Sequence, residues 1–376
     1  MKHGASRREE SERLHARARA FARAFEEGRA PPEAFDALAC DLARFQAAYV
    51  PGYARLCSAR ALDPATFRRA ADAPAVPQEA FKLARVFAFD DGDATATFRT
   101  SGTTGAARGV HAMRTTETYD LASVAFARHT LTRGLPARVP VLVLGPAPRE
   151  LPDASLAHMI ARFVEVFGEP ASEEETYFVT DGVLDLEALD RRVARLVVEE
   201  RNGVLVMATS FALVHVLDAL GDATFPMPRG TRVMHTGGYK GRSRELDPAE
   251  LRRDVARAFG VGEADIACEY GMTELTSQFY EAVLVDPAAP HGVYLEPPWA
   301  RVVPVDPETL APVAGGEVGV ARIEDLMNVD SAFCVLASDR VRSAGPGRFE
   351  LLGRARGAPP RGCSIAIDDM LSSGVA

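Results

Sequence analysis

The chain has 376 residues, of which 47% are hydrophobic and 25% are charged, and its formal net charge is −9 at pH 7. This length exceeds one ordinary domain, and the apolar fraction is sufficient for a sizeable core. The acidic balance argues against a nucleic-acid-binding protein, because such proteins normally concentrate basic residues on one face. A few local donors would still suffice to bind an anionic nucleotide.

The N-terminal sequence and the cysteines indicate the compartment. Residues 1–28 are charged throughout and lack the apolar stretch of a secretory signal, so they are predicted to form an amphipathic helix. No apolar run approaches the roughly 18 residues of a membrane span. The five cysteines are scattered, without a CxxC pair or zinc-ligand spacing, which is typical of a reducing compartment. We therefore expect a cytoplasmic protein without a membrane span.

The first part of the chain, residues 1–95, is predicted to be mainly helical. Apolar side chains recur at helical spacing at Phe21, Ala24 and Phe25 and again at Phe35, Leu38 and Leu42. Prolines and glycines at 31–32 and 51–52 separate the helices. The short apolar stretch Val86–Phe89, followed by four Asp and Gly residues, predicts a strand that enters a turn.

From residue 98 onward the pattern alternates between strands and helices. Helices are predicted at Thr116–His129, Leu156–Phe167, Leu186–Arg201, Ser210–Leu220 and Pro248–Phe259, the last with Asp247 as its N-cap. Strands are predicted at Val139–Leu144, Val204–Met207, Thr231–His235 and Ile266–Tyr270, and further short strands at Val293–Leu295, Ala300–Val305, Gly319–Ile323 and Phe349–Leu352. The alternation predicts an α/β fold with a mostly parallel sheet, followed by a small β-rich part.

A loop of glycines and hydroxyls begins directly after Phe98–Arg99. It consists of Thr100, Ser101, Gly102, Thr103, Thr104 and Gly105, and Arg108 and Gly109 come shortly after it. Glycines let the backbone approach a phosphate closely, and hydroxyls and free N–H groups can donate to its oxygens. Arg108 can add a charge-assisted contact. The loop lacks the GxxxxGK[ST] pattern of a Walker loop, and by composition alone it also fits a polar turn.

A second polar group of residues lies at the end of the predicted strand Ile266–Tyr270. There Tyr270 can stack on a base, Thr273 can donate to a phosphate and Glu274 can hold Mg²⁺, a cation that prefers oxygen ligands. Glu269 is either a second ligand or the end of the strand. Taken alone, the segment also fits a turn before a helix capped by Thr273. His111 and His235 have no recognisable partners, and structural roles are expected for both.

The order TSGTTG at 100–105 and YGMTE at 270–274 resembles the adenylate-forming superfamily of acyl-CoA synthetases, nonribosomal adenylation domains and luciferases. The resemblance implies the large N-terminal domain of that superfamily, with layered sheets, flanking helices and a small β-rich subdomain, and it implies ATP and Mg²⁺ as cofactors. It also implies roles for further residues: Gly237, Gly238 and Tyr239 beside the adenine with Tyr270 and Gly271, Asp339 at the ribose hydroxyls, and Gly353 and Arg354 at the domain hinge.

The sequence departs from the superfamily at several positions. Ala107–Arg108 replaces a Pro-Lys pair, Ala337–Ser338 replaces a Thr-Gly pair, and Arg356 replaces the hinge acid. The sequence ends soon after Arg354, where a full enzyme continues with a domain of roughly 100 residues that bears the adenylation lysine. Lys240 could act in its place, and a solvated loop lysine is an equally good interpretation.

The short C-terminal part narrows the resemblance to one family. With HTGGYKGR at 235–242 and LLGR…RGCS at 351–364, the chain resembles the acyl-protein synthetases of bacterial bioluminescence operons. The resemblance implies that a fatty acid is activated with ATP and then moved to a cysteine near the C-terminus, here Cys363. Arginines at 354, 356 and 361 would lower the pKa of that thiol. Pro359, Pro360 and Gly362 predict an exposed, irregular segment, and an incidental cysteine in a disordered tail is the alternative.

Together these inferences predict an adenylation domain over residues 1–352, with a helical part at 1–95 and a β-rich part at about 290–352, and a hinge remnant with a mobile segment at 353–376. The expected catalytic residues are Cys363, Thr273, Glu274 and Arg354. The expected partner is an acyl reductase or another acyl acceptor. Two alternatives stay open: an acyl-CoA or other acyl ligase completed by a separate polypeptide, and a non-catalytic acyl- or nucleotide-binding module.

Overall fold

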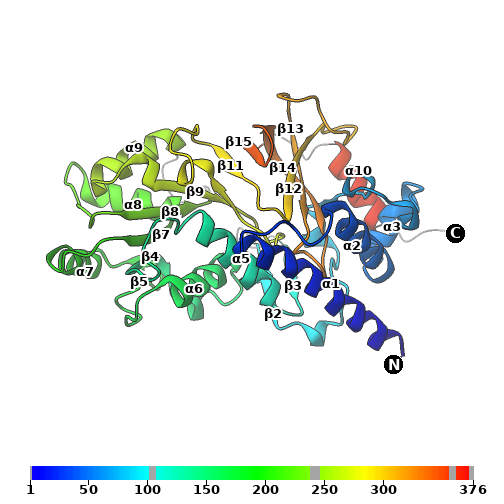
Figure 1. The fold of residues 1–376 in the computed structure, drawn as a ribbon, viewed down its shortest axis with the longest axis horizontal. Helices are drawn as coiled ribbons and strands as arrows, with labels where there is room; N and C mark the ends of the chain where they lie inside the picture. Colours follow the sequence, from blue (N-terminus) through cyan, green and yellow to red (C-terminus); the bar gives the residue numbers. More distant parts are fainter. Residues whose placement is uncertain (1, 101–106, 238–245, 355–360, 372–376) are drawn as a thin grey trace. The chain divides into compact units, whose positions relative to one another are not determined.

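The computed structural model describes residues 2–100, 107–237, 246–354 and 361–371, except for the side chains of 2–5 and 361–364 (Figure 1). The chain divides into two units. Unit 1 consists of Met1–Ala125, Met272–Gln278 and Tyr294–Ala376, and unit 2 consists of Phe126–Gly271 and Phe279–Val293. Within the described ranges, no helix is long and apolar enough to cross a membrane.

Unit 2 is built on a mostly parallel sheet. Its strands are β4 (Val141–Pro146), β5 (Tyr177–Thr180), β6 (Val183–Leu184), β7 (Val204–Thr209), β8 (Thr231–Thr236), β9 (Ile266–Tyr270) and β10 (Phe279–Glu281), in the order β10-β9-β8-β7-β4-β5-β6. Strands β4, β5, β7, β8 and β9 run parallel, whereas β6 and β10 pair antiparallel at the two ends of this order. Its helices are α6 (Ser155–Phe167), α7 (Leu186–Val198), α8 (Ser210–Leu220) and α9 (Pro248–Phe259), and α5 (Glu117–His129) begins in unit 1 and ends in unit 2.

The sequence explains why this sheet forms. Strand β7 reads VLVMAT and its first five residues are buried, as expected for a parallel strand that is covered on both faces. Alternate residues of the parallel strands pack against α7, α8 and α9 to form one core. The Asp247 side chain accepts hydrogen bonds from the amides of Ala249 and Glu250, so its predicted N-cap role on α9 is confirmed.

Unit 1 combines helices with an antiparallel sheet. Its helices are α1 (Lys2–Glu26), α2 (Phe35–Tyr49), α3 (Pro51–Ala59), α4 (Ala80–Leu83) and α10 (Arg361–Leu371). Its sheet contains β11 (Val293–Leu295), β12 (Ala300–Val305), β13 (Val318–Asp325), β14 (Cys334–Ser343) and β15 (Arg348–Arg354), in the order β12-β13-β14-β15-β11, with β1 (Val76–Pro77) parallel to β14. Strands β2 (Ala96–Arg99) and β3 (Val110–Met113) form a separate antiparallel hairpin.

Short 3₁₀ turns connect these elements in both units. They are η1 (Pro64–Thr66), η2 (Ala70–Asp72), η3 (Asp91–Asp93), η4 (Pro148–Glu150), η5 (Glu263–Asp265) and η6 (Ala282–Leu284). The predicted strand Val86–Phe89 is wrong, because this segment is irregular although all four residues are buried. Phe87 and Phe89 pack with Ala112 in a small cluster, and the Ala88 amide donates to the Asp330 carbonyl instead of to a strand. The apolar run Val86–Phe89 is therefore buried without pairing to another strand.

The C-terminal segment also differs from the expectation of an irregular stretch. Residues Arg361–Leu371 form helix α10, which lies beside α3 (Figure 1). Ala366 and Met370, four residues apart on one helix face, are fully buried. The Arg55 side chain donates to the Met370 carbonyl at 2.6 Å. The expectation is therefore wrong for these residues, whereas the expected domain boundary at 352 stays a prediction.

We expect Met370→Ala to weaken the attachment of α10 to α3. Removal of a fully buried methionine side chain typically lowers the free energy of unfolding by about 2–5 kcal/mol. Because α10 can detach while the rest of the protein stays folded, the loss of stability cannot exceed the free energy with which α10 is docked. Urea unfolding and hydrogen exchange of α10 would measure both effects. Leu371→Ala is the matched control, because this neighbour is 43% exposed. Equal effects of the two substitutions would contradict the docked position of α10.

Candidate active site

The base of the predicted phosphate loop is closed by two hydrogen bonds between Thr100 and Gly109. The Thr100 amide donates to the Gly109 carbonyl at 2.9 Å, and the Gly109 amide donates to Thr100 Oγ1 at 2.8 Å. These bonds continue the pairing of β2 with β3. The Arg108 guanidinium donates to the carbonyls of Thr100 and Arg99 at 2.6 and 3.2 Å. The other predicted loop residues, Ser101, Gly102, Thr103, Thr104 and Gly105, lie outside the described residues.

Gly109 brings this loop base into contact with the predicted metal ligand. A Cβ atom at Gly109 would lie 2.9 Å from Thr100 Cγ2 and 3.5 Å from Glu274 Oε1. The first distance is shorter than side chains tolerate, so a residue larger than glycine would force Thr100 to move. Two motifs that are distant in sequence, the glycine-rich loop and YGMTE, therefore meet in unit 1 at Gly109 and Glu274.

The burial of the Glu274 carboxylate is only partly compensated. The residue is 1% exposed, and neither carboxylate oxygen has a hydrogen-bond partner among the described residues. Burial raises the pKa of Glu274 to about 7, and the nearby Gln78 and Lys82 side chains offset only part of that effect. A buried carboxylate of this kind is costly unless it is protonated or meets a cation. The oxygen donors fit Mg²⁺, which commonly binds to one or two carboxylates together with substrate phosphates.

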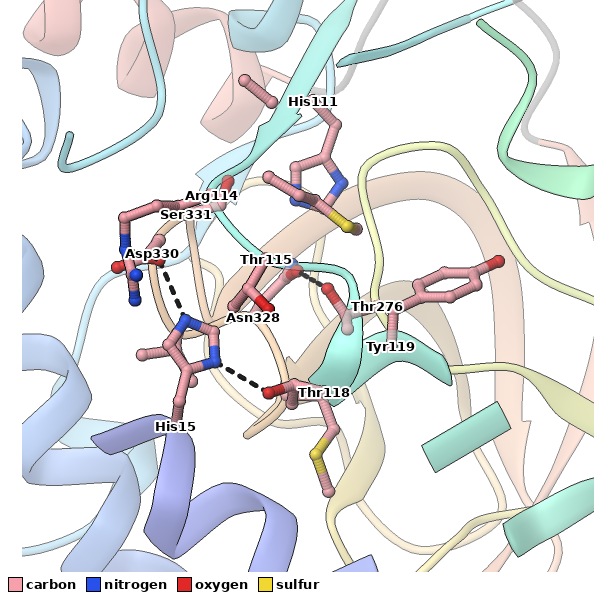
Figure 2. Close-up of a pocket in the computed structure, with 14 residues that line it drawn as sticks. His15, His111, Arg114, Thr115, Thr118, Tyr119, Thr276, Asn328, Asp330 and Ser331 are labelled. Atoms are coloured by element: carbon pink, nitrogen blue, oxygen red, sulfur yellow. Dashed lines mark hydrogen bonds and ion pairs between the residues drawn. The ribbon is translucent and has the colours of Figure 1, made fainter. Parts of the chain in front are cut away.

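A buried polar framework holds the main chain around Glu274. The side-chain amide of Asn328 donates to the carbonyls of Glu274 and Ala332 at 2.8 and 2.9 Å. Thr276 Oγ1 donates to the Asn328 side-chain oxygen, a contact that is visible in Figure 2. Asp325 accepts from the Thr276 amide at 2.9 Å. Every one of these groups is buried, so the framework leaves the segment around Glu274 little freedom.

His111 supports the neighbouring Thr273 from strand β3. Its Nδ1 lies 2.7 Å from the Thr273 carbonyl, which can only accept, so Nδ1 carries the proton. Burial lowers the pKa of His111 to about 4, although the hydrogen bond to Thr273 opposes the shift. The ring is therefore neutral at pH 7 and acts as a fixed donor. The structural role expected of His111 is thus to hold the Thr273 carbonyl, a partner that no spacing in the sequence predicts.

A second polar cluster lies on the other side of β3 and includes His15 of α1. Figure 2 shows the His15 ring between Asp330 and Thr118, at 2.9 and 2.8 Å. Ser11 and Arg114 also contact Asp330. Burial raises the pKa of Asp330, but the hydrogen bond with His15, followed by the Ser11 and Arg114 contacts, holds it below its ordinary value. The cavity lined by these residues has a volume of about 20 Å³, which is enough for about one water molecule. Since Thr118 is 1% exposed, this hydroxyl–imidazole–carboxylate chain holds α1 in place and does not form a substrate site.

In unit 2 the predicted adenine-side residues follow paired strands. Thr236 of β8 lies opposite Glu269 of β9 and donates to its carboxylate. Burial raises the pKa of Glu269 to about 7. Gly237 and Tyr270 thus lie at the carboxyl ends of neighbouring parallel strands, where α/β sheets bind ligands. The Tyr270 ring is largely buried against Phe279, with ring centroids 5.9 Å apart.

A close approach at Gly271 and a left-handed backbone at Gly237 explain two glycines in this part of unit 2. A Cβ atom at Gly271 would come too close to Glu269 Oε1, so a larger residue would force the Glu269 carboxylate to move. Gly237 has a φ of +77°, a conformation that glycine adopts readily. Gly238, Tyr239 and Lys240 lie outside the described residues.

Ser210 and His235 fix the Gly237 carbonyl. Ser210 Oγ donates to that carbonyl at 2.8 Å and lies 2.9 Å from His235 Nδ1. The hydroxyl has one proton, so the imidazole must be the donor in the second bond. Burial lowers the pKa of His235 to about 4, which keeps the ring neutral. Sequence reasoning missed Ser210 because its partners lie 25 and 27 positions away.

The remaining predicted residues lie at the C-terminal end of unit 1. Asp339 of β14 is paired with Arg354 of β15, and the Arg354 Nε lies 3.5 Å from Asp339 Oδ1. The Arg354 side chain is 74% exposed, so the attraction contributes little to stability. Cys363 is the third residue of α10.

The predicted site residues divide between the units. Thr100, Arg108, Thr273, Glu274, Asp339 and Arg354 belong to unit 1, whereas Gly237, Tyr270 and Gly271 belong to unit 2. Among the described residues, no three His, Cys, Asp or Glu side chains cluster in a way that could hold a metal ion. Mg²⁺ at Glu274 would therefore depend on substrate oxygens for most of its ligands.

Comparisons with known proteins concern the family and the fold of the chain. The family model "Acyl-protein synthetase, LuxE" matches residues 19–372. The long-chain-fatty-acid–luciferin-component ligase of Vibrio harveyi is 24% identical over 312 residues, which cover 80% of this chain and 79% of that protein. The crystal structure of an open conformation of 2-hydroxyisobutyryl-CoA ligase, in complex with 2-HIB-AMP and CoA, matches with a TM-score of 0.55 and 13% identity, over 83% of this chain and 74% of that chain.

A second structure of the same ligase, in the postadenylation state, matches with a TM-score of 0.58 and 12% identity, over 85% of this chain and 67% of that chain. At these identities the two likenesses concern the fold. They confirm the predicted α/β fold of the adenylate-forming enzymes, and the family match confirms the family inferred from the sequence motifs.

We expect Glu274→Gln to stabilise the metal-free protein at pH 8. With its pKa raised from 4.5 to about 7, Glu274 binds a proton in the folded state that it loses in the unfolded state between these pH values. The wild-type carboxylate therefore destabilises the fold increasingly as the pH rises through that range. Glutamine removes this effect, so the gain should be about 1–3 kcal/mol at pH 8 and should vanish below pH 4.5.

Urea unfolding across this pH range in the presence of a chelator would measure the difference. Glu187→Gln is the control, since its side chain is 91% exposed and its removal should leave the pH profile unchanged. A Glu274→Gln protein that is no more stable than wild type at pH 8 would show that the carboxylate is compensated.

Proposed function

Because this chain belongs to the acyl-protein synthetase (LuxE) family, we propose that it activates a long-chain fatty acid with ATP and then carries the acyl group on Cys363. Membership of the family makes it an ATP-dependent acyl ligase. The choice of acid is our inference from the name of the Vibrio harveyi relative. The observation that carries the proposal is the buried, only partly compensated carboxylate of Glu274 at the base of the Thr100–Gly109 loop.

In the proposed first step the carboxylate of the acid attacks the α-phosphorus of ATP. A bond forms between the carboxylate oxygen and the α-phosphorus, the bond to the bridging oxygen breaks, and pyrophosphate leaves with the electron pair. The loop at 100–105 holds the phosphates through its hydroxyls and amides, and Thr273 donates to a phosphate oxygen. Glu274 would hold Mg²⁺, which when bound supplies positive charge beside the phosphates. The framework of His111 and Asn328 keeps Thr273 and Glu274 in position.

On the nucleotide side, the resemblance assigns Gly237, Gly238, Tyr239, Tyr270 and Gly271 to the adenine, and it separately assigns Asp339 to the ribose hydroxyls. Support for the first part comes from the arrangement of Gly237 and Tyr270 at the carboxyl ends of β8 and β9. The Asp339 carboxylate can accept hydrogen bonds from hydroxyls, and it lies 3.5 Å from the Arg354 Nε.

In the proposed second step the Cys363 thiolate attacks the acyl carbon of the adenylate. A carbon–sulfur bond forms, the bond to the AMP oxygen breaks, and AMP leaves. The position of Cys363 in the first turn of α10 supports this role, because a helix N-terminus favours the thiolate. An acyl reductase or another acceptor would then take the acyl group from the thioester.

Two measurements on the same samples test the proposal. Wild-type protein should exchange labelled pyrophosphate into ATP only when a long-chain fatty acid is present, and its intact mass should rise by one acyl group after incubation with Mg²⁺-ATP and the acid. Cys363→Ser should keep the exchange within about twofold and lose the mass increase, because the thiol acts only in the second step. Cys268→Ser, which alters a partly exposed thiol in β9, should behave as wild type in both.

A mass increase that persists in Cys363→Ser would overturn the cysteine step and leave activation intact. Acyl transfer from Cys363→Ser to coenzyme A at the wild-type rate would instead identify an acyl-CoA ligase.

A further inference from the structure

The side chain of Gln46 ties helix α2 to the loop between β13 and β14. Gln46 is 1% exposed. Its Nε2 donates to the carbonyls of Asn328 and Val329 at 2.9 and 3.0 Å, and its Oε1 accepts from the Phe333 amide at 3.1 Å. Since carbonyls only accept and main-chain amides only donate, these partners fix the orientation of the side-chain amide. One buried side chain therefore binds the main chain of the loop, residues 326–333, at three points.

The same loop holds the segment that carries Glu274. Asn328 Nδ2 donates to the Glu274 carbonyl at 2.8 Å, and Thr276 Oγ1 donates to Asn328 Oδ1. The main chain of Asn328 is thus bound by Gln46, while its side chain binds Glu274 and Thr276. A short asparagine side chain reaches both partners only while its own main chain stays in place. A shift of the loop is therefore passed on to Glu274.

Two further anchors hold the later part of the loop. The Asp330 carboxylate accepts hydrogen bonds from side chains of α1, and Ser331 Oγ donates to the Val86 carbonyl at 2.8 Å. These anchors act two and three positions after Asn328, whereas the bonds from Gln46 fall on Asn328 itself and on the next residue. Gln46 therefore controls the position of the Asn328 side chain more directly than either of them.

We propose that Gln46 is a positioning residue for acyl-adenylate formation, because it fixes Asn328 and through it the segment 273–276. The inference rests on the proposed adenylation reaction, in which Thr273 and Glu274 act beside the phosphates. Gln46 acts through Asn328 and not by contact with ATP or the acid. Misplacement of a reacting group by about 1 Å can slow a reaction by about 10²-fold, so loss of these hydrogen bonds lowers the rate of catalysis as well as the stability.

Two substitutions remove the donors of Gln46 in different ways. Gln46→Glu keeps the shape of the side chain and an acceptor for the Phe333 amide, but a carboxylate has no proton to donate to the two carbonyls. Gln46→Met fills a similar space without a strong donor or acceptor, so it removes all three hydrogen bonds without burying a charge. Leu38→Ala is the matched control, because it removes a fully buried side chain from the same helix and destabilises the fold by leaving a cavity.

We expect both Gln46 variants to lower the maximal rate of fatty-acid-dependent pyrophosphate exchange by about 10–100-fold, measured per folded molecule. The KM for the fatty acid should stay within about twofold of wild type, since the acid is not among the groups that the loop holds. Leu38→Ala should exchange pyrophosphate at the wild-type rate under conditions in which it is folded. Circular dichroism of the same samples gives the folded fraction.

Hydrogen exchange of the protein without ligands tests the path of contacts separately from the reaction. In Gln46→Met the amides of residues 326–333 and 272–278 should exchange at least about tenfold faster than in wild type, because a hydrogen-bonded anchor of the loop is lost. The amides of β15, in the same unit, should change much less. In Leu38→Ala the two segments should change no more than β15.

Unchanged protection of residues 272–278 in Gln46→Met would overturn the inference. A rate of pyrophosphate exchange in Gln46→Met equal to that of Leu38→Ala would also overturn it. Absence of pyrophosphate exchange in the wild-type protein would instead overturn the proposed adenylation reaction and, with it, this role of Gln46.

Discussion

The carboxylate of Glu274 is held away from water, neither of its oxygens has a hydrogen-bond partner in the described part of the chain, and the surrounding contacts hold the segment in place. A free side chain would relax toward solvent, since burial of a charged group is costly. Relaxation is prevented because the main chain of the segment is tied to Asn328, Asp325 and His111. The protein thus keeps an only partly compensated acceptor in a fixed place, and a cation-bearing ligand can supply the missing charge without reorganisation of the site.

The short YGMTE motif is supported by two separate sets of contacts. Tyr270 and Gly271 end β9 in unit 2, where Glu269 and Thr236 form the adjoining hydrogen bond. Thr273 and Glu274 belong to unit 1 and depend on groups from β3 and from the segment after β13. The five consecutive residues of this motif are therefore held in place by contacts in two different units. A residue larger than glycine at Gly271 would displace the Glu269 carboxylate from its hydrogen bond with Thr236.

The parts of the fold that could be predicted from sequence are those with local causes. Helix α9 was predicted with its correct bounds because Asp247 caps it and Gly260 ends it in a left-handed conformation. Strand β14 was not predicted because Asp339 and Arg340 interrupt its apolar pattern. Helix α10 was not predicted because Pro359, Pro360 and Gly362 indicated an irregular segment, and only two of its side chains, Ala366 and Met370, are fully buried. The site showed the same division. Thr273 and Glu274 stood out through their motif, whereas His111, Asn328 and Ser210 matter only through contacts with residues distant in sequence.

The docked helix α10 changes how a cysteine relay would work. A mobile tail would leave Cys363 free at all times, whereas docking through Ala366, Met370 and the Arg55 contact restrains the helix that carries it. If release of α10 requires about 3 kcal/mol, roughly one molecule in a hundred is undocked at equilibrium. Acyl transfer that required the undocked helix would then be slowed by about the same factor. The rate of the proposed transfer would then depend on contacts to α3 as well as on the chemistry of the adenylate.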